Sequence, residues 1–201
     1  MSARNPIKGT SVLLEAPNID TDQIMPKQFC LRTDRSGYQD AVFFEWRRSS
    51  DSALNQPRAL TSPLLIAGPN FGCGSSREHA VWGLLDFGFR AVIAPSYGDT
   101  FRANSGAAGL VTAGIATADY QRLLAVLHHD IDTPLELDVA AQELRLCTTG
   151  NASAVSVQIP AFHRYLYLGG FTEAELAAYH DDKIREYEAH RPAWMPRIEI
   201  D

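Results

Sequence analysis

Hydroxyl and guanidinium groups that can handle an anion gather in residues 72–80, which read GCGSSREHA. Two glycines in this stretch allow the backbone to turn sharply and to come close to a ligand. Ser75 and Ser76 follow, and either hydroxyl can act beside a bound anion as an acid, a base or a nucleophile. Arg77 adds a planar fork that matches a carboxylate or a phosphate. These residue types point to a site for a small anion.

A helix is expected to begin at this site. Apolar residues recur at helical spacing and stop at Gly88, which predicts a helix over residues 76–87. Its first turn would expose unpaired N–H groups and a partial positive charge, both of which favour an anion. Ser75 and Glu78 also have the spacing of a capping box, which is a purely structural role. Capping does not require Arg77 or a second serine, and the two roles can coexist.

Other glycine-loop motifs do not fit this stretch. Gly72 and Gly74 are followed by Arg77 where a dinucleotide fingerprint needs its third glycine, and no Walker A lysine follows. The order G-S-S-R also lacks the second glycine of a nucleophile elbow. Cys73 can be read as a thiolate near a helix N-terminus, but a small filler in a tight loop is the more ordinary role.

Size and charge limit the classes of protein. The chain has 201 residues and a formal net charge of -6, and its length predicts a single domain over 1–201 with a peripheral helical segment over about 160–201. The acidic balance without a basic block argues against nucleic acid or an anionic membrane as a partner. No apolar run approaches the roughly 18 residues that cross a bilayer, and no signal peptide is recognisable. A cytoplasmic protein is expected.

The cysteines and histidines predict no metal site. Cys30, Cys73 and Cys147 are far apart in the sequence and form no C-x-x-C pair. The densest histidine cluster, residues 128–130, is explained as the polar end of a helix, where the helix dipole favours histidine. We therefore expect no metal ligand in this chain.

The order of elements predicts an α/β fold. Buried strands at 64–67 and 91–95 flank the helix over 76–87, and this order implies a parallel βαβ core. Ligands in such sheets bind at the carboxyl ends of the strands, where the glycine loop falls. The other expected elements are strands at 11–15, 110–113 and 155–159, helices at 40–48, 99–104, 119–128, 162–168 and 172–190, an exposed loop at 49–61, and a hairpin at 135–146.

Two longer motifs resemble one known family. Residues 18–29, NIDTDQIMPKQF, and residues 70–80, NFGCGSSREHA, closely resemble the small subunit of bacterial 3-isopropylmalate dehydratase (isopropylmalate isomerase). The resemblance runs over nearly the whole chain and continues at residues 88–94, 99–104, 108–110, 187–188 and 191–195. This family corresponds to the swivelling domain of aconitase as a separate polypeptide. The resemblance thus implies an aconitase-like swivelling domain (β/β/α) with peripheral C-terminal helices.

The resemblance also implies a chemistry. In this superfamily a [4Fe-4S] cluster on the large subunit activates the substrate hydroxyl, so no cofactor is expected on this chain. Ser75 is expected to act as an alkoxide that removes the proton alpha to a carboxylate, while Ser76 and Arg77 bind substrate carboxylate. A serine hydroxyl is a very weak acid and ionises at neutral pH only in a strong positive potential. The helix N-terminus, the loop amides and Arg77 are the expected sources.

The motif at residues 18–22 matches the family's second active-site loop. Asp22 is expected there to support catalytic histidines across the subunit interface, with Thr21, Gly72 and Gly74 as supporting residues. The residues alone also suit an Asx-type turn, which is the plainer reading.

The resemblance also implies that a third loop reads the side chain of the substrate. Cys30, Leu31 and Arg32 occupy it, and Leu31 suits an apolar isopropyl group although Arg32 is its neighbour. Arg35 lies near a position where relatives hold a substrate-binding arginine.

The sequence therefore predicts the small subunit of a hydro-lyase that is active only with a large subunit. It would interconvert 2-isopropylmalate and 3-isopropylmalate through 2-isopropylmaleate in leucine biosynthesis. One alternative is a paralogous dehydratase subunit for another hydroxy acid, of the citramalate or homoaconitate type. Another is a non-catalytic anion-binding module, with Ser75 as cap and Arg77 as clamp. A self-contained cysteine or serine hydrolase is a third.

Overall fold

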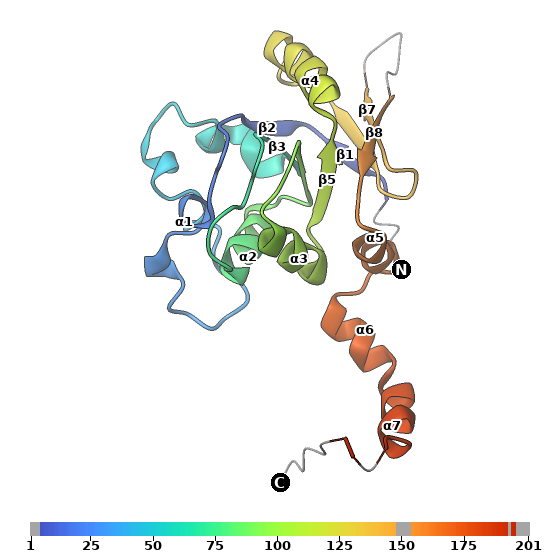
Figure 1. Ribbon diagram of the computed structural model, residues 1–201. Helices are drawn as coiled ribbons and strands as arrows, with labels where there is room; N and C mark the ends of the chain where they lie inside the picture. Colours follow the sequence, from blue (N-terminus) through green and yellow to red (C-terminus); the bar gives the residue numbers. More distant parts are fainter. Residues whose placement is uncertain (1–4, 148–153, 193, 196–201) are drawn as a thin grey trace.

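The strands expected from the sequence join one mixed sheet of eight strands, and the computed structural model describes residues 5–147, 154–192, 194 and 195 (Figure 1). Four strands run parallel, in the order β2 (Ser11–Leu14), β3 (Leu64–Ala67), β4 (Ala91–Ala94) and β5 (Val111–Ile115). Beyond β5 the sheet continues with antiparallel pairing through β8 (Ala154–Gln158), β7 (Glu143–Leu146), β6 (Leu135–Asp138) and β1 (Ile7–Gly9). The α/β class, the parallel core and the hairpin are confirmed.

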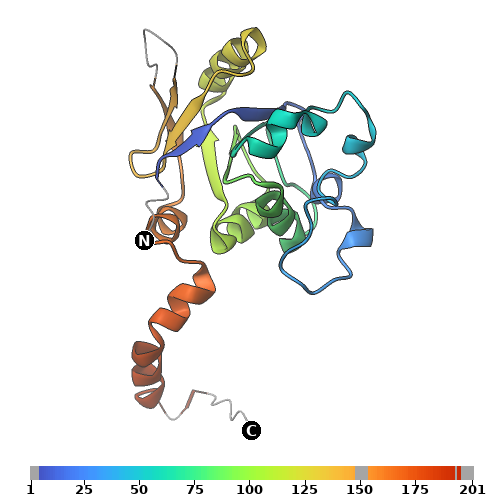
Figure 2. The same cartoon turned by 180° about the vertical axis from the view of Figure 1, so that it is seen from behind.

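The two ends of this strand order belong to one stretch of chain, because only Thr10 separates β1 from β2. The sheet therefore curls, and its inner face encloses a hydrophobic core to which both halves contribute. Helix α4 (Thr117–His129) adds Leu123 and Leu127 to this core. In both ribbon views α4 lies above the sheet, whereas the other long helices lie below it (Figures 1 and 2).

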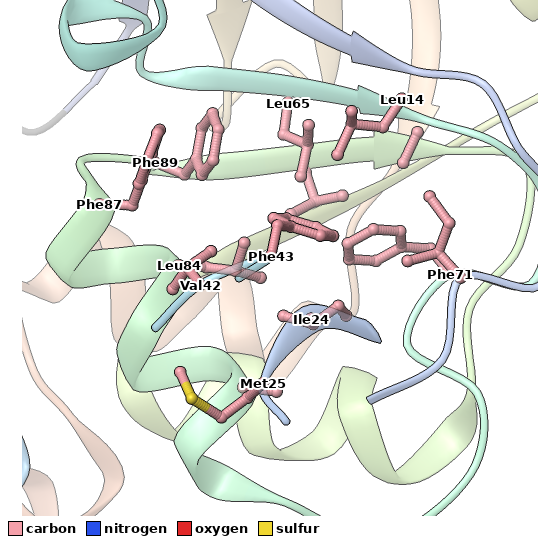
Figure 3. Close-up of a cluster of buried hydrophobic side chains, with 14 of the residues drawn as sticks. Leu14, Ile24, Met25, Val42, Phe43, Leu65, Phe71, Leu84, Phe87 and Phe89 are labelled. Atoms are coloured by element: carbon pink, nitrogen blue, oxygen red, sulfur yellow. The ribbon is translucent and has the colours of Figure 1, made fainter. Parts of the chain in front are cut away.

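A second core fills the space between the parallel strands and the helices α2 (Glu78–Phe87) and α3 (Asp99–Ala108) (Figure 3). Successive residues of β3 alternate between the cores, since Leu65 belongs to this one and Leu64 to the other. All four residues of β3 are buried in consequence. Burial on both faces is the reason that these strands appear in the sequence as continuous apolar runs.

The prediction of a helix over residues 40–48 is wrong except for the last turn. The chain forms turns there, followed by the short 3-10 helix η2 (Trp46–Arg48). Val42 and Phe43 are both fully buried. Phe43 adopts a left-handed backbone with φ 51°, and its N–H donates to the carbonyl oxygen of Ile24 at 2.8 Å. Tertiary packing has overridden the amphipathic pattern.

Several boundaries differ from the expected ones by a few residues or by an added break. Helix α2 begins at Glu78 rather than at 76, and α3 extends beyond 104 to Ala108. The expected exposed loop contains two 3-10 helices, and the expected helix over 172–190 is divided at His180. The elements concerned are η3 (Ala53–Asn55), η4 (Pro57–Thr61), α6 (Glu173–Tyr179) and α7 (Asp181–Ala189); the remaining ones are α1 (Thr21–Ile24), η1 (Lys27–Phe29) and α5 (Ala161–Gly169).

The last helices differ in how they are attached to the body. Helix α5 buries Leu166 and Tyr167, whereas α6 and α7 bury none of their residues. Both ribbon views show α7 extended away from the sheet (Figures 1 and 2). Ile184 of α7 remains 41% exposed. Residues 196–201 of the segment expected to be peripheral lie outside the described part of the chain.

Removal of α7 is expected to leave the stability of the isolated chain nearly unchanged. A chain ending at His180 should unfold with a free energy within about 0.5 kcal/mol of the full chain, because the lost surface is solvated in both states. Leu166→Ala should cost about 2–5 kcal/mol, because Leu166 is 0% exposed. Urea unfolding followed by circular dichroism measures both. A large loss on truncation would show that α7 packs on the body.

Helix α3 fixes the glycine loop in place. Gly72 has a left-handed backbone with φ +71°, and a Cβ atom there would lie 2.2 Å from Cγ of Phe101. Phe101 is itself buried and packs edge-on against Phe71, with ring centroids 5.3 Å apart. Gly72 thus satisfies both a turn and a close approach that no other residue type allows.

Gly72→Ala is therefore expected to destabilise the chain more than a glycine-to-alanine change that alters the backbone alone. The variant adds about 1–2 kcal/mol of left-handed strain and about 1–3 kcal/mol of overpacking against Phe101. Gly109→Ala is the matched control, since Gly109 has φ +88° but nothing within 4 Å of the added Cβ. Equal losses for the two variants in urea unfolding would contradict the close approach.

Candidate active site

The two predicted active-site loops meet because they follow neighbouring parallel strands. Residues 15–20 come after β2 and residues 68–77 after β3, so both leave the sheet at its carboxyl edge. The N–H of Gly72 donates to the carbonyl oxygen of Ile19 at 2.7 Å, and the N–H of Thr21 donates to that of Cys73 at 2.9 Å. These backbone hydrogen bonds join the loops as a short continuation of the sheet.

Thr21 adds a side-chain contact to this junction. Its hydroxyl donates to the carbonyl oxygen of Ser75 at 2.9 Å, and Thr21 is buried. A Cβ atom on Gly74, which has φ +92°, would lie 3.6 Å from the same hydroxyl oxygen. Thr21 therefore holds the backbone at Ser75, and Gly74 supplies the left-handed turn before it.

The turn residues of the first loop have separate tasks. Asp20 caps α1, because its side chain accepts from the N–H of Gln23 at 2.8 Å and the Gln23 side chain accepts in return. Asn18 has a left-handed backbone with φ 58° and accepts from Nδ2 of Asn70 at 2.8 Å. The plainer, turn-forming role thus applies to Asn18 and Asp20. It leaves the carboxylate of Asp22 free for another partner.

That partner is Arg77. Nη1 of Arg77 donates to Oδ1 of Asp22, and Nη2 donates to Oδ2 at 2.9 Å, which makes a bidentate ion pair. Nη1 also donates to the carbonyl oxygen of Met25 at 3.3 Å. The hydrogen bond from Arg77 lowers the pKa of Asp22, and the same hydrogen bond raises the pKa of Arg77. Both side chains are thus charged at neutral pH.

Ser75 and Ser76 are exposed beside this ion pair. The N-cap of α2 is Arg77, and no side chain caps the helix by a hydrogen bond, so the capping box of Ser75 and Glu78 is not formed. Ser75 lies two residues before the N-cap, and the field of a helix terminus falls off within about one turn. The helix N-terminus therefore lies farther from Ser75 than the expected start at 76 implied.

The loop with Cys30, Leu31 and Arg32 lies against the first turns of α2. The Cys30 thiol is half-buried and burial raises its pKa, whereas Leu31 is 87% exposed. The guanidinium of Arg32 lies 5.2 Å from the ring centroid of Tyr38 and donates to Asp34 and to the carbonyl oxygen of Gly37, both at 3.3 Å. Arg32 is thus engaged within its own loop.

Arg35 is placed over a different part of α2. Its guanidinium lies 5.8 Å from the Trp82 ring, and it lines a cavity of about 560 Å³ between α2, α3 and α6. Glu78 also lines this cavity, but Ser75 and Ser76 do not. The structure therefore brings Thr21, Asp22 and the G-S-S-R residues together and leaves Arg35 at a separate hollow.

Two features of the site were not predicted from the sequence. They are the side chains that anchor the loop with Arg32 to α2, and the partner of Asp22. His79 Nε2 donates to the carbonyl oxygen of Arg32 at 2.9 Å, and the rings of His79 and Trp82 lie 4.7 Å apart. Tyr38 completes the cluster, with its ring 5.4 Å from that of His79. The spacing of three residues between His79 and Trp82, which places both rings on one face of α2, could have predicted this cluster. The pairing of Asp22 with Arg77 had no local signal, since 55 residues separate them.

No metal site competes with this reading within the described residues. No group of three or more His, Cys, Asp and Glu side chains there is arranged to hold a metal ion. None of the described helices combines the length and apolar character that crossing a bilayer requires.

Comparison with known proteins identifies the family. The model of the aconitase C-terminal domain family matches residues 3–118. The 3-isopropylmalate dehydratase small subunit of Clavibacter michiganensis subsp. michiganensis is 41% identical over 191 residues, which cover 95% of this chain and 92% of that protein. The small subunit of Beutenbergia cavernae is 40% identical over 188 residues, which cover 94% of this chain and 87% of that protein.

A solved structure shares the fold. A 3-isopropylmalate dehydratase structure from Methanocaldococcus jannaschii matches with a TM-score of 0.68 at 24% identity, over 90% of this chain and 99% of that one. At this identity the likeness concerns the fold alone, and it confirms the fold expected from the sequence motifs. The chain belongs to the aconitase C-terminal domain family and, within it, to the 3-isopropylmalate dehydratase small subunits.

Proposed function

We propose that this chain is the small subunit of a 3-isopropylmalate dehydratase and works with a large subunit in leucine biosynthesis in the cytoplasm. One observation carries the proposal: backbone hydrogen bonds bring the loop with Thr21 and Asp22 against the loop with Ser75, Ser76 and Arg77. Both loops match the family motifs, and they form one exposed corner. A site of this kind, open to solvent, can be completed by a second subunit.

Ser75 has the position that a base in such a corner needs. Its hydroxyl is exposed, while its backbone is fixed through the contact between its carbonyl oxygen and Thr21. We assign to Ser75 the removal of the proton on the carbon alpha to the substrate carboxylate. Ser75 would take this proton, and the hydroxyl would leave as water after accepting a second proton from an acid on the large subunit. The two losses together give 2-isopropylmaleate. Return of water with the opposite regiochemistry gives the isomeric hydroxy acid, so the reaction is reversible and needs no net oxidant.

Arg77 suits the carboxylate-binding role, since a guanidinium pairs with a carboxylate through two parallel hydrogen bonds. The bond that it makes with Asp22 has this geometry. Ser76 lies between Ser75 and Arg77, and its exposed hydroxyl can donate to the same carboxylate.

The [4Fe-4S] cluster, expected on the large subunit, finds no fitting set of ligands among the described residues of this chain. Such clusters are held by several cysteine thiolates, and the three cysteines here lie on separate segments, with no metal-binding group among the described residues. We therefore assign the cluster to the large subunit, where it would polarise the substrate hydroxyl.

The substrate that this corner favours carries an apolar substituent. Leu31 is 87% exposed in the loop expected to read the side chain, and the charge of Arg32 is satisfied by Asp34 and by the face of Tyr38. A homoaconitate-type acid carries a further carboxylate, and Arg32, the cation next to Leu31, is already paired with Asp34. The anion-binding module is also disfavoured, because Ser75 does not cap α2.

Ser75→Ala is expected to lower kcat by about 10²–10⁴-fold when the chain is combined with its cluster-loaded large subunit, because general-base catalysis is lost. The measurement is the absorbance of 2-isopropylmaleate formed from 3-isopropylmalate under anaerobic conditions. Ser76→Ala is the matched control and should mainly raise KM, because its hydroxyl binds rather than reacts. Co-purification of both variants with the large subunit shows that assembly is intact. Near-wild-type kcat for Ser75→Ala would refute the catalytic assignment.

Arg77→Lys is expected to raise KM by about tenfold or more, because one ammonium replaces a bidentate guanidinium. The change in kcat should be smaller than the change in KM. Steady-state kinetics of the assembled enzyme separate the two constants. An unchanged KM with a reduced kcat would place Arg77 outside the carboxylate-binding site.

A further inference from the structure

The guanidinium of Arg77 has two edges that can grip a carboxylate, and Asp22 occupies one of them. The end-on edge is formed by Nη1 and Nη2, and each donates to one oxygen of Asp22. The carbonyl oxygen of Met25 accepts a further hydrogen bond from Nη1. Asp22 thus makes the same contact with Arg77 that a ligand carboxylate would make.

Exposure shows which partner faces the solvent. The side chain of Arg77 is 15% exposed, whereas that of Asp22 is 57% exposed. Asp22 therefore forms the outer half of the pair. A carboxylate that approaches Arg77 along this edge meets another carboxylate first, and the positive charge it would seek is already neutralised.

The side chain of Asp22 is not needed to hold its own loop. Asp20 and Gln23 cap α1, and Thr21 makes the contacts to the second loop. Ile24 and Met25 anchor the segment in the core beside α2 (Figure 3). Within the described residues, the recorded hydrogen bonds of the Asp22 carboxylate are those from Arg77. The carboxylate can therefore leave Arg77 without unfolding of the loop.

We propose that Asp22 is an internal substitute for the ligand carboxylate: in the isolated chain it occupies the end-on edge of Arg77, and a dicarboxylate binds there by displacing it. The proposal rests on the proposed function in that Arg77 is the carboxylate clamp. It adds that the clamp is masked until Asp22 leaves. The masked site holds small anions weakly, so the free subunit is not blocked by the many anions of its surroundings.

The exchange conserves hydrogen bonds. Two bonds from Arg77 to Asp22 are lost and two to the ligand are gained, so the balance depends on where the Asp22 carboxylate goes. In the free chain the carboxylate would return to water, with the charge of Lys27 acting on it. A docked partner subunit that offers Asp22 a hydrogen-bond donor or a cation would shift this balance towards the open clamp, which couples ligand binding to assembly.

Asp22→Asn in the full, isolated chain tests the proposal. The variant removes the competing charge but keeps the size of the side chain, and malonate is the probe. Its dissociation constant is measured by NMR titration of the Arg77 Nε–H signal at constant ionic strength. We expect malonate to bind about tenfold or more tighter to Asp22→Asn than to the wild type, as expected when a charge-assisted competitor is lost. The gain should disappear in the double variant Asp22→Asn with Arg77→Gln.

A charge-matched control separates masking from general electrostatics. Asp34→Asn removes one equal charge from the neighbouring loop, where Asp34 pairs with Arg32 and not with Arg77. It should change the affinity for malonate by less than about twofold. The amide spectrum of each variant shows whether the fold is preserved.

Unchanged or weaker binding of malonate to Asp22→Asn would overturn the proposal and show that Asp22 positions Arg77 instead of masking it. An equal gain in Asp34→Asn would overturn it as well, because the effect would then be one of net charge. These titrations need neither the large subunit nor turnover. A failure here therefore leaves the dehydratase assignment untouched, and a failure of the turnover assays leaves the masking intact.

Discussion

The parallel pairing of β2 with β3 is the constraint on which the site depends. Because the two strands end at the same edge of the sheet, the loops that follow them pair for a few more residues, with Gly72 donating to Ile19 and Thr21 donating to Cys73. A shift of one residue in this register would turn every side chain of β3 to the other core. The two hydrophobic cores therefore fix the register, and the register fixes the distance between Asp22 and Arg77.

Local patterns were sufficient for the strands and the hairpin but not for the site's connections. The strands at 64–67 and 91–94 and the hairpin at 135–146 follow from apolar runs and period-two alternation, which depend on neighbours in the sequence. The segment with Val42 and Phe43 was mistaken for a helix because its burial is imposed by distant residues such as Ile24. The ion pair of Asp22 and Arg77 depends likewise on strand register across 55 residues. The family motifs named both residues, but not their contact.

The isolated corner provides less positive potential at Ser75 than its sequence suggested. Arg77 is neutralised by Asp22, and α2 begins at Glu78, so that its first free amides lie beyond Ser75. Ionisation of a serine hydroxyl needs a strong and unscreened positive field. In the function we propose, Ser75 ionises only when the large subunit and a ligand complete the field, which would give a physical reason for dividing the chemistry between two chains. The same dependence would keep a reactive alkoxide from forming in the free subunit.

In the function we propose, selectivity for the substrate depends on how the arginines near the corner are held. The guanidinium groups of Arg32 and Arg35 lie over the rings of Tyr38 and Trp82, and Leu31 beside them is 87% exposed. An arginine that stacks on an aromatic ring and pairs with Asp34 has little affinity to offer a third carboxylate. In the function we propose, carboxylate recognition at this corner rests on Arg77, and the loop contributes an apolar contact. That division favours a dicarboxylate with a branched apolar substituent over an acid that carries one more charge.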